Sequence, residues 1–224
     1  MSDTLFRMAG ERQDERMQAV AIATQLDYYY FQGTNEDSVI HYTNKVKEFA
    51  KATHQPKYYY FAWANRLITY YLKTSRTNIA LYEVQNMLKE AQEEDDKTGL
   101  SRCYNIMSQI YTIKRFDSMA FEWRLKEIEL TEKYKIENYN ISQTYAQIAN
   151  YYINQKKQKE ALAAVEKAIA TANSSTQQIS AKLEFVNYYS KFGDFQAAEK
   201  LLKECQAAFE QDKRLESIKK RLYN

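Results

Sequence analysis

The chain has 224 residues, of which 45% are hydrophobic and 27% are charged, and its net charge is only +3 at pH 7. This charge is too small to indicate a nucleic-acid-binding protein, for which a clustered basic face is expected. No apolar run reaches the roughly 20 residues of a membrane span, and Asp3, Arg7 and Glu11 interrupt the stretch where a signal peptide would have its apolar core. We therefore expect a soluble chain that meets a membrane only through segments outside it.

The composition predicts an all-α protein. The chain contains one proline and four glycines, so it has few helix breakers, and Ala, Glu, Lys, Gln and Leu are abundant. Five helical pairs are expected, with polar or glycine-containing turns between their helices. Their ranges are residues 11–54, 57–97, 100–137, 140–173 and 176–212, preceded by a short helix at 3–10 and followed by a basic terminal helix at 214–223.

Turn signals separate these helices. Residues 32–35 contain Gly33, and Pro56 follows His54-Gln55 at the end of the first pair, because the residue before proline is pushed out of the helical region. Residues 74–77, 154–157 and 193–194 read as turns inside pairs. Residues 97–99 are expected to close the second pair, the acidic run 93–96 to be a solvated connector, and residues 173–175 to cap the last pair.

Three columns of residues repeat in register along the chain. The first is a tyrosine near the end of each first helix, with steps of 41, 40, 41 and 37 residues. The second is a small residue nine positions later, and the third is an apolar residue four positions earlier. The columns are Tyr30, Tyr71, Tyr111, Tyr152 and Tyr189; Val39, Ala80, Ala120, Ala161 and Ala198; and Leu26, Leu67, Met107, Ile148 and Phe185.

Each column has a physical purpose. The tyrosine fills the wedge between the two helices of a pair, the small residue lets the second helix approach the first, and the apolar residue packs on the next pair. A helical pair cannot bury its apolar face alone, so the five pairs are expected to stack. The sequence therefore predicts a single solenoid over residues 1–224, taken as part of a longer protein.

These columns resemble the tetratricopeptide repeat (TPR). Residues 142–173 match its pattern best, through Tyr145, Ile148-Ala149, Tyr152, Ala161 and Ala168. Residues 179–205 match as well, and residues 61–87 match more loosely. The resemblance implies an all-α, right-handed superhelix of about five helical hairpins with a capping helix at its C-terminus. HEAT and armadillo repeats have periods nearer to 40 residues, but they lack the spacing of nine between the tyrosine and the small residue.

Two copies depart from the pattern. The first has Asp27 and Val39 where small residues are usual, and the third has Arg124 and Glu127 in its second helix. Long, tyrosine-rich, degenerate repeats of this kind resemble the sensory regions of bacterial sensor histidine kinases and of TPR-containing transcriptional regulators. This resemblance implies a sensory or regulatory domain in a bacterial signal-transduction protein, in the periplasmic part of a membrane-anchored chain or, alternatively, in the cytoplasm. The alternative function is a free-standing adaptor or co-chaperone that binds peptides.

The TPR resemblance also implies where a partner binds, because the first helices line the concave face of such a solenoid. The positions that face the groove are rich in Asn and Gln, whose amides offer a donor and an acceptor to a peptide backbone. We expect a protein or peptide partner there, with a small ligand or a second copy of the chain as alternatives. The candidate residues are Asn65, Arg66, Thr69, Lys73, Arg102, Asn105, Gln109, Gln143, Gln147, Asn150, Asn154, Asn187 and Lys191.

The other possible binding sites in the sequence also have simpler interpretations. In the carboxylate clamp of TPR co-chaperones, Arg102 would fall at one position, but Ile106 occupies the next and Thr69 replaces an expected asparagine. The paired tyrosines could form a platform for carbohydrate or for an aromatic ligand, although core packing explains them as well. His41 and His54 stand alone, without the spacing of metal ligands.

No catalytic residue, metal site or cofactor is expected from this sequence. Cys103 and Cys205 lack CxxC or Cys/His spacing and are interpreted as buried hydrophobic residues. A glycine-rich phosphate loop, a nucleophile elbow and an HExxH motif are all missing from the sequence. We therefore expect a non-enzymatic chain.

Overall fold

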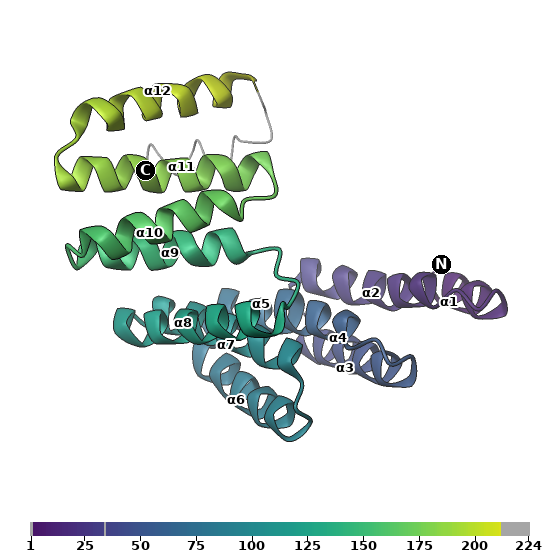
Figure 1. The fold of residues 1–224 in the computed structure, drawn as a ribbon. Helices are drawn as coiled ribbons and strands as arrows, with labels where there is room; N and C mark the ends of the chain where they lie inside the picture. Colours follow the sequence, from purple (N-terminus) through teal and green to yellow (C-terminus); the bar gives the residue numbers. More distant parts are fainter. Residues whose placement is uncertain (1, 34, 212–224) are drawn as a thin grey trace. The chain divides into compact units, whose positions relative to one another are not determined.

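The computed structural model describes residues 2–33 and 35–211, and over these residues it contains helices and no strand. The chain divides into two compact units, Met1–Lys114 and Arg115–Asn224, both drawn in Figure 1. Within the described ranges, no helix is long and apolar enough to cross a membrane. The terminal helix expected at 214–223 lies outside the described residues, and a single solenoid over the whole chain stays a prediction.

The first unit packs its helices mainly on their neighbours in sequence. α1 packs on α2, α2 on α3, α3 on α4 and η1, α5 on α6, and α6 on α7. The elements are α1 (Ser2–Glu11), α2 (Glu15–Gln32), α3 (Glu36–Ala52), α4 (Pro56–Ala62), η1 (Trp63–Ile68), α5 (Thr69–Lys73), α6 (Thr77–Glu93) and α7 (Lys97–Ile113).

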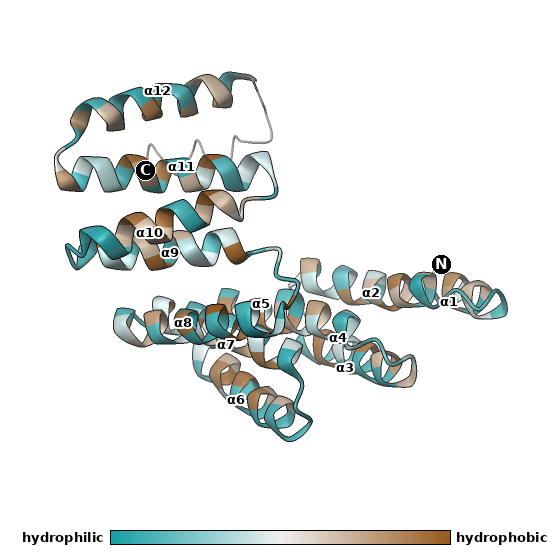
Figure 2. Ribbon diagram, in the orientation of Figure 1, coloured by the Kyte–Doolittle hydropathy of each residue, from teal (hydrophilic) through white to brown (hydrophobic). Residues whose placement is uncertain are grey.

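The second unit is a layered stack that follows chain order, as Figure 1 shows for α9 to α12. α9 contacts α8, α10 and α11, and α11 contacts α10 and α12. Polar and apolar stretches alternate along these helices in Figure 2, as expected for helices that are buried on one side. The elements are α8 (Asp117–Tyr134), α9 (Ile141–Asn154), α10 (Gln158–Ala170), α11 (Ser175–Phe192) and α12 (Phe195–Gln211).

The small-residue column is the most completely buried of the three. Val39, Ala80, Ala120 and Ala161 have no exposed surface, and Ala198 is 6% exposed. The paired packing of α2 on α3, α5 on α6, α9 on α10 and α11 on α12 agrees with the expected approach at this column. The predicted third pair has α7 at the end of one unit and α8 at the start of the other, so its pairing stays a prediction.

Most of the helix bounds agree with the sequence prediction, but residues 97–99 do not close a hairpin. They form the first turn of α7, because the Asp96 side chain caps this helix by accepting a hydrogen bond from the Gly99 backbone N–H at 3.0 Å. Asp96 also accepts a hydrogen bond from the Tyr60 hydroxyl. The end of the acidic run is therefore a helix cap that also contacts α4, rather than only a solvated connector.

The first helix of the second pair contains a π-helical segment that the sequence analysis missed. α4, η1 and α5 run without a break from Pro56 to Lys73, and η1 widens the turn over Trp63–Ile68. The Thr69 hydroxyl donates to the Ala64 carbonyl, five residues earlier, at 3.0 Å. The widened turn displaces the register of the side chains that follow, and such segments are frequent at functional sites.

Most inter-helix turns contain one residue in the left-handed conformation. Gly33 (φ 68°) and Gly193 (φ 92°) serve two of them, while non-glycine residues such as Ser75 (φ 59°) and Lys156 (φ 57°) serve others. After Lys156, the Lys157 backbone N–H donates to the Tyr152 carbonyl at 2.9 Å, and Asp194 donates to Tyr189 in the same way at 3.0 Å. The carbonyls of Tyr152 and Tyr189 therefore also accept the hydrogen bonds that end their helices.

This geometry predicts that Lys156→Gly stabilises the protein. A non-glycine residue with φ 57° is strained, so glycine should raise the free energy of unfolding by about 0.5–1 kcal/mol. The matched control is Ala163→Gly in the interior of α10 at an exposed position, which should lower it by about 1 kcal/mol. Urea unfolding followed by circular dichroism measures both, and a destabilised Lys156→Gly variant would contradict the turn geometry.

Candidate functional site

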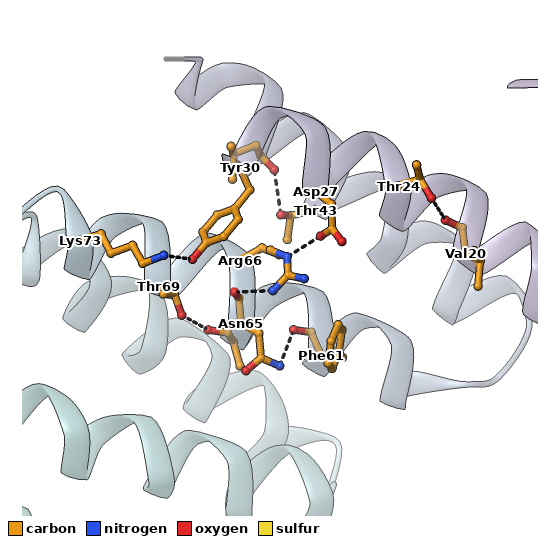
Figure 3. Close-up of polar contacts among 12 residues, drawn as sticks. Val20, Thr24, Asp27, Tyr30, Thr43, Phe61, Asn65, Arg66, Thr69 and Lys73 are labelled. Carbon is orange, nitrogen blue, oxygen red and sulfur yellow. Dashed lines mark hydrogen bonds and ion pairs between the residues drawn. The ribbon is translucent and has the colours of Figure 1, made fainter. Parts of the chain in front are cut away.

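Arg66 of η1 is the most heavily engaged of the candidate residues, as Figure 3 shows. Its Nε donates to the Asp27 carboxylate of α2, and its Nη1 donates to the Asn65 carbonyl at 3.0 Å. The guanidinium also lies 5.1 Å from the ring centroid of Tyr30 and 5.6 Å from that of Phe31. Arg66 and Asp27 therefore tie η1 to α2, which gives a role to one of the residues at which the first copy departs from the TPR pattern.

The neighbouring candidates on this helix are engaged in the same region (Figure 3). The Asn65 side-chain amide donates to the Phe61 carbonyl at 3.1 Å, and Lys73 Nζ donates to the Tyr30 hydroxyl at 2.6 Å. Thr69 bonds within the π-helical segment. In the first unit, Arg66 and Lys73 therefore link their helix to α2, while Asn65 and Thr69 bond within their own helix. We call these four residues, with Asp27 and Tyr30, the polar clasp.

The candidates on α7 differ in exposure. Gln109 is exposed and donates from Nε2 to the Asn105 Oδ1 at 2.7 Å, whereas Arg102 is half-buried. Ile106 is only 3% exposed. Because Ile106 fills the next clamp position with a buried aliphatic side chain, the geometry disfavours a co-chaperone carboxylate clamp.

In the second unit, the candidates form two adjacent stripes. Gln143, Gln147, Asn150 and Asn154 are spaced at helical intervals along α9, and Asn154 Nδ2 donates to Asn150 Oδ1 at 2.9 Å. Asn187 and Lys191 extend along α11, one helical turn after Glu184.

A contact between α9 and α11 brings these stripes together. Asn150 Nδ2 donates to the Glu184 Oε2 at 3.4 Å. Gln143, Asn154, Asn187 and Lys191 are exposed, while Gln147 and Asn150 are half-buried. We call this surface the amide face; it comprises Gln143, Gln147, Asn150, Asn154, Glu184, Asn187 and Lys191.

Beside the amide face lie the two charged residues at which the third copy departs from the TPR pattern. Arg124 is 7% exposed and Glu127 is 1% exposed. Arg124 Nε donates to Gln147 Oε1 at 2.8 Å, and Glu127 accepts from Asn138 Nδ2 at 2.8 Å. Burial lowers the pKa of Arg124, and the nearby Glu127 carboxylate opposes this shift. These charges fix Gln147 and the start of α9, a function that the sequence analysis did not recognise.

A second polar cluster joins α8, α9 and α10. Tyr145 and Lys167 both donate to Glu132, with the Lys167 Nζ at 2.8 Å from Oε1. The hydrogen bond from Lys167, followed by that from Tyr145, lowers the pKa of Glu132, and the pKa of Lys167 is raised by the same contact. The cluster lies on a different stripe of α9 from Gln147, and it holds the helix that carries the amide face.

Most of the paired tyrosines pack inside the units. Both Tyr59 and Tyr60 are buried, as are both Tyr70 and Tyr71. In the second unit, Tyr151 stacks on Phe121 with ring centroids 4.0 Å apart. Burial inside the units therefore accounts for these side chains, and it leaves few of them available for a carbohydrate platform.

The described part of the chain contains no group of three or more His, Cys, Asp or Glu side chains able to hold a metal ion. Cys103 and Cys205 are free and buried. Burial raises the pKa of the Cys103 thiol to about 12, so this thiol is protonated at neutral pH. A protonated, buried thiol is a poor nucleophile.

The comparisons with known proteins concern the fold. No family model and no curated protein matches the chain. Among solved structures, the chain is similar to BtubC (BKLC) from P. vanneervenii, with a TM-score of 0.70 at 15% identity over 93% of this chain and 88% of that one. It is also similar to the apo form of RapI, with a TM-score of 0.65 at 15% identity over 95% of this chain and 59% of RapI. The fold is therefore an all-α, TPR-like helical-repeat fold, as expected.

The buried charges give a test of how the amide face is supported. Glu127→Ala removes the carboxylate that compensates the buried Arg124 charge most, with Asp117 contributing less, and it takes the acceptor away from Asn138. We therefore expect the free energy of unfolding to fall by about 3 kcal/mol. Gln147→Ala removes a single polar partner of Arg124 and should cost about 1–2 kcal/mol. The exposed Glu129 of α8 provides a control, and Glu129→Ala should stay within about 0.5 kcal/mol of the parent. Equal unfolding midpoints for Glu127→Ala and Glu129→Ala would contradict the buried arrangement.

Proposed function

We propose that the chain is a non-catalytic scaffold that binds an extended segment of a partner protein across the amide face of its second unit. The observation that carries this proposal is the 3.4 Å contact between Asn150 and Glu184, which joins the stripes on α9 and α11 into one polar surface. The similar TPR-like structures support the broader role of an interaction scaffold.

The dimensions of the amide face suit an extended peptide. From Gln143 to Asn154 the helix advances by roughly 16 Å at 1.5 Å per residue. A strand-like peptide covers this length with about five residues at 3.3 Å each. Backbone N–H and C=O groups recur along such a peptide, and amide side chains can accept from the first and donate to the second.

The charges of the amide face favour backbone recognition over a strongly charged ligand. Glu184 is engaged by Asn150, and Lys191 is exposed near the end of α11. One carboxylate and one ammonium give the surface no net charge. A partner segment of mixed or neutral composition would therefore avoid the repulsion that like charges impose at an interface.

At the level of the whole protein, we propose a sensory or regulatory domain of a bacterial signal-transduction protein. A free-standing adaptor is the alternative. The open reading frame separates the two, because a kinase or DNA-binding module encoded in frame with this chain supports the first. A frame that encodes only the TPR-like region would refute it and leave the adaptor.

Peptide binding is tested with Asn154→Ala/Asn187→Ala, because both side chains are exposed and neither is part of a core cluster. Peptides are selected on the parent protein from a random phage-displayed library, and their affinities are measured by fluorescence anisotropy. Loss of two side-chain hydrogen bonds, each contributing about 0.5–1.5 kcal/mol, should weaken binding roughly 5- to 150-fold.

The matched control is Gln178→Ala/Gln206→Ala, which removes two exposed amides from α11 and α12. Gln178 lies nine residues before Asn187, so it projects from the opposite side of α11. This variant should bind with the parent's affinity. The proposal fails if both double variants bind equally well, or if the control is the weaker of the two.

A further inference from the structure

The first unit contains a cavity of about 390 Å³ that belongs to neither the polar clasp nor the amide face. It lies among α1, α2 and α3, and α1 is outside the five helical pairs of the repeat pattern. Cavities that hold small molecules occupy about 300–1,000 Å³. A cavity of this size, made by an added helix, is not required by the stacking of helical pairs.

α1 is held over this cavity at two points. The Ser2 hydroxyl donates to the Ala21 carbonyl of α2 at 2.7 Å. Phe6 meets Phe49 of α3 edge to face, with ring centroids 6.3 Å apart. These contacts fix the helix on both of its neighbours while the space between them stays open.

The apolar part of the lining is aromatic to a large extent. Phe6, Tyr42 and Phe49 contribute rings, and Ile22 contributes an aliphatic wall. The Tyr42 ring is held in place because it stacks on Tyr29, with centroids 5.4 Å apart and an interplanar angle of 14°. Rings fixed in this way offer their faces to an apolar or cationic group.

The charged part of the lining carries more carboxylate than ammonium. Asp3 and Glu48 line the cavity together with a single cation, Lys45. Lys45 Nζ lies 5.2 Å from the centroid of the Tyr42 ring. Within the described residues, the side chains of Asp3 and Glu48 take part in none of the hydrogen bonds or ion pairs of the structure. The two carboxylates therefore remain available to a ligand.

We propose that this cavity binds a small organic ammonium ion, namely an amine attached to one aromatic ring or a short aliphatic chain. The ring or chain packs against Phe6, Ile22 and Phe49, and the ammonium group is neutralised by Asp3 and Glu48. Aromatic faces attract such cations electrostatically. A carboxylate ligand of the same shape meets two like charges and is rejected.

The test uses the full chain and three probes with the same aromatic body: 2-phenylethylamine, 2-phenylethanol and 3-phenylpropionate. Binding is followed by ¹H–¹⁵N correlation spectra and by isothermal titration calorimetry at low salt. We expect saturable binding of the amine with shifts on α1, α2 and α3, at least tenfold weaker binding of the alcohol, and none of the carboxylate. Hexylamine serves as the aliphatic amine and should also bind.

A double variant of the lining and a matched control test whether the amine binds in the cavity. Asp3→Asn/Glu48→Gln should weaken amine binding at least tenfold, and it should melt like the parent because both side chains are exposed. The control Glu11→Gln/Asp37→Asn changes two exposed carboxylates of α1 and α3 outside the lining and should keep the parent's affinity.

Ala52→Phe, at the exposed end of the lining, should block both amines by filling the space. Three results would overturn the proposal: no saturable binding of either amine, equal binding of the amine and the carboxylate, or full amine binding by the Asp3→Asn/Glu48→Gln variant. Since none of these measurements involves the amide face, they leave peptide binding to its own test.

Discussion

Close approach of two helices at a small side chain is the constraint on which the hairpins depend. Ala161 in the first turn of α10 has no exposed surface, and Ala198 in the first turn of α12 is 6% exposed. A larger side chain at either position would force the helices apart, and overpacking of this kind typically costs about 1–3 kcal/mol. The approach leaves one side of each first helix outside the hairpin, and this is where the amide face lies.

Because the small-residue column holds the two helices of a pair together, other positions of the repeat can carry polar side chains. The third copy buries Arg124 and Glu127 in the second unit, yet α8 still packs on α9. The two charged side chains are tolerated because Arg124 donates to Gln147 and Glu127 accepts from Asn138. The first copy uses Asp27 in the same way, as the partner of Arg66 on the next first helix. Departures from the repeat pattern therefore mark polar contacts between neighbouring elements.

The periodicity of the sequence made much of the fold predictable. The hydrogen-bond partners of individual polar side chains could not be predicted in this way. The spacing of nine between Tyr152 and Ala161 placed α9, its turn and α10 within a few residues. The π-helical segment at Trp63–Ile68 was not recognised, because the apolar pattern predicts a helix there without distinguishing a widened turn from an α-helical one. The start of α7 was predicted wrongly, because an acidic run before Gly99 is compatible both with a solvated connector and with a helix N-cap such as Asp96. Among the groove candidates, the helical spacing of Gln143, Gln147, Asn150 and Asn154 could be read from the sequence, whereas the contact between Arg66 and Asp27 could not.

The central claim is that a partner segment lies along the stripes of α9 and α11. Side-chain amide resonances test it most directly, because the side-chain NH2 groups of Asn150, Asn154 and Asn187 each contribute a pair of N–H signals to ¹H–¹⁵N spectra. Titration with a selected peptide should shift these signals and leave that of Gln206 on α12 unchanged. Shifts confined to Gln206 and to the backbone of α10 and α12, with the three asparagine signals unmoved, would contradict the account.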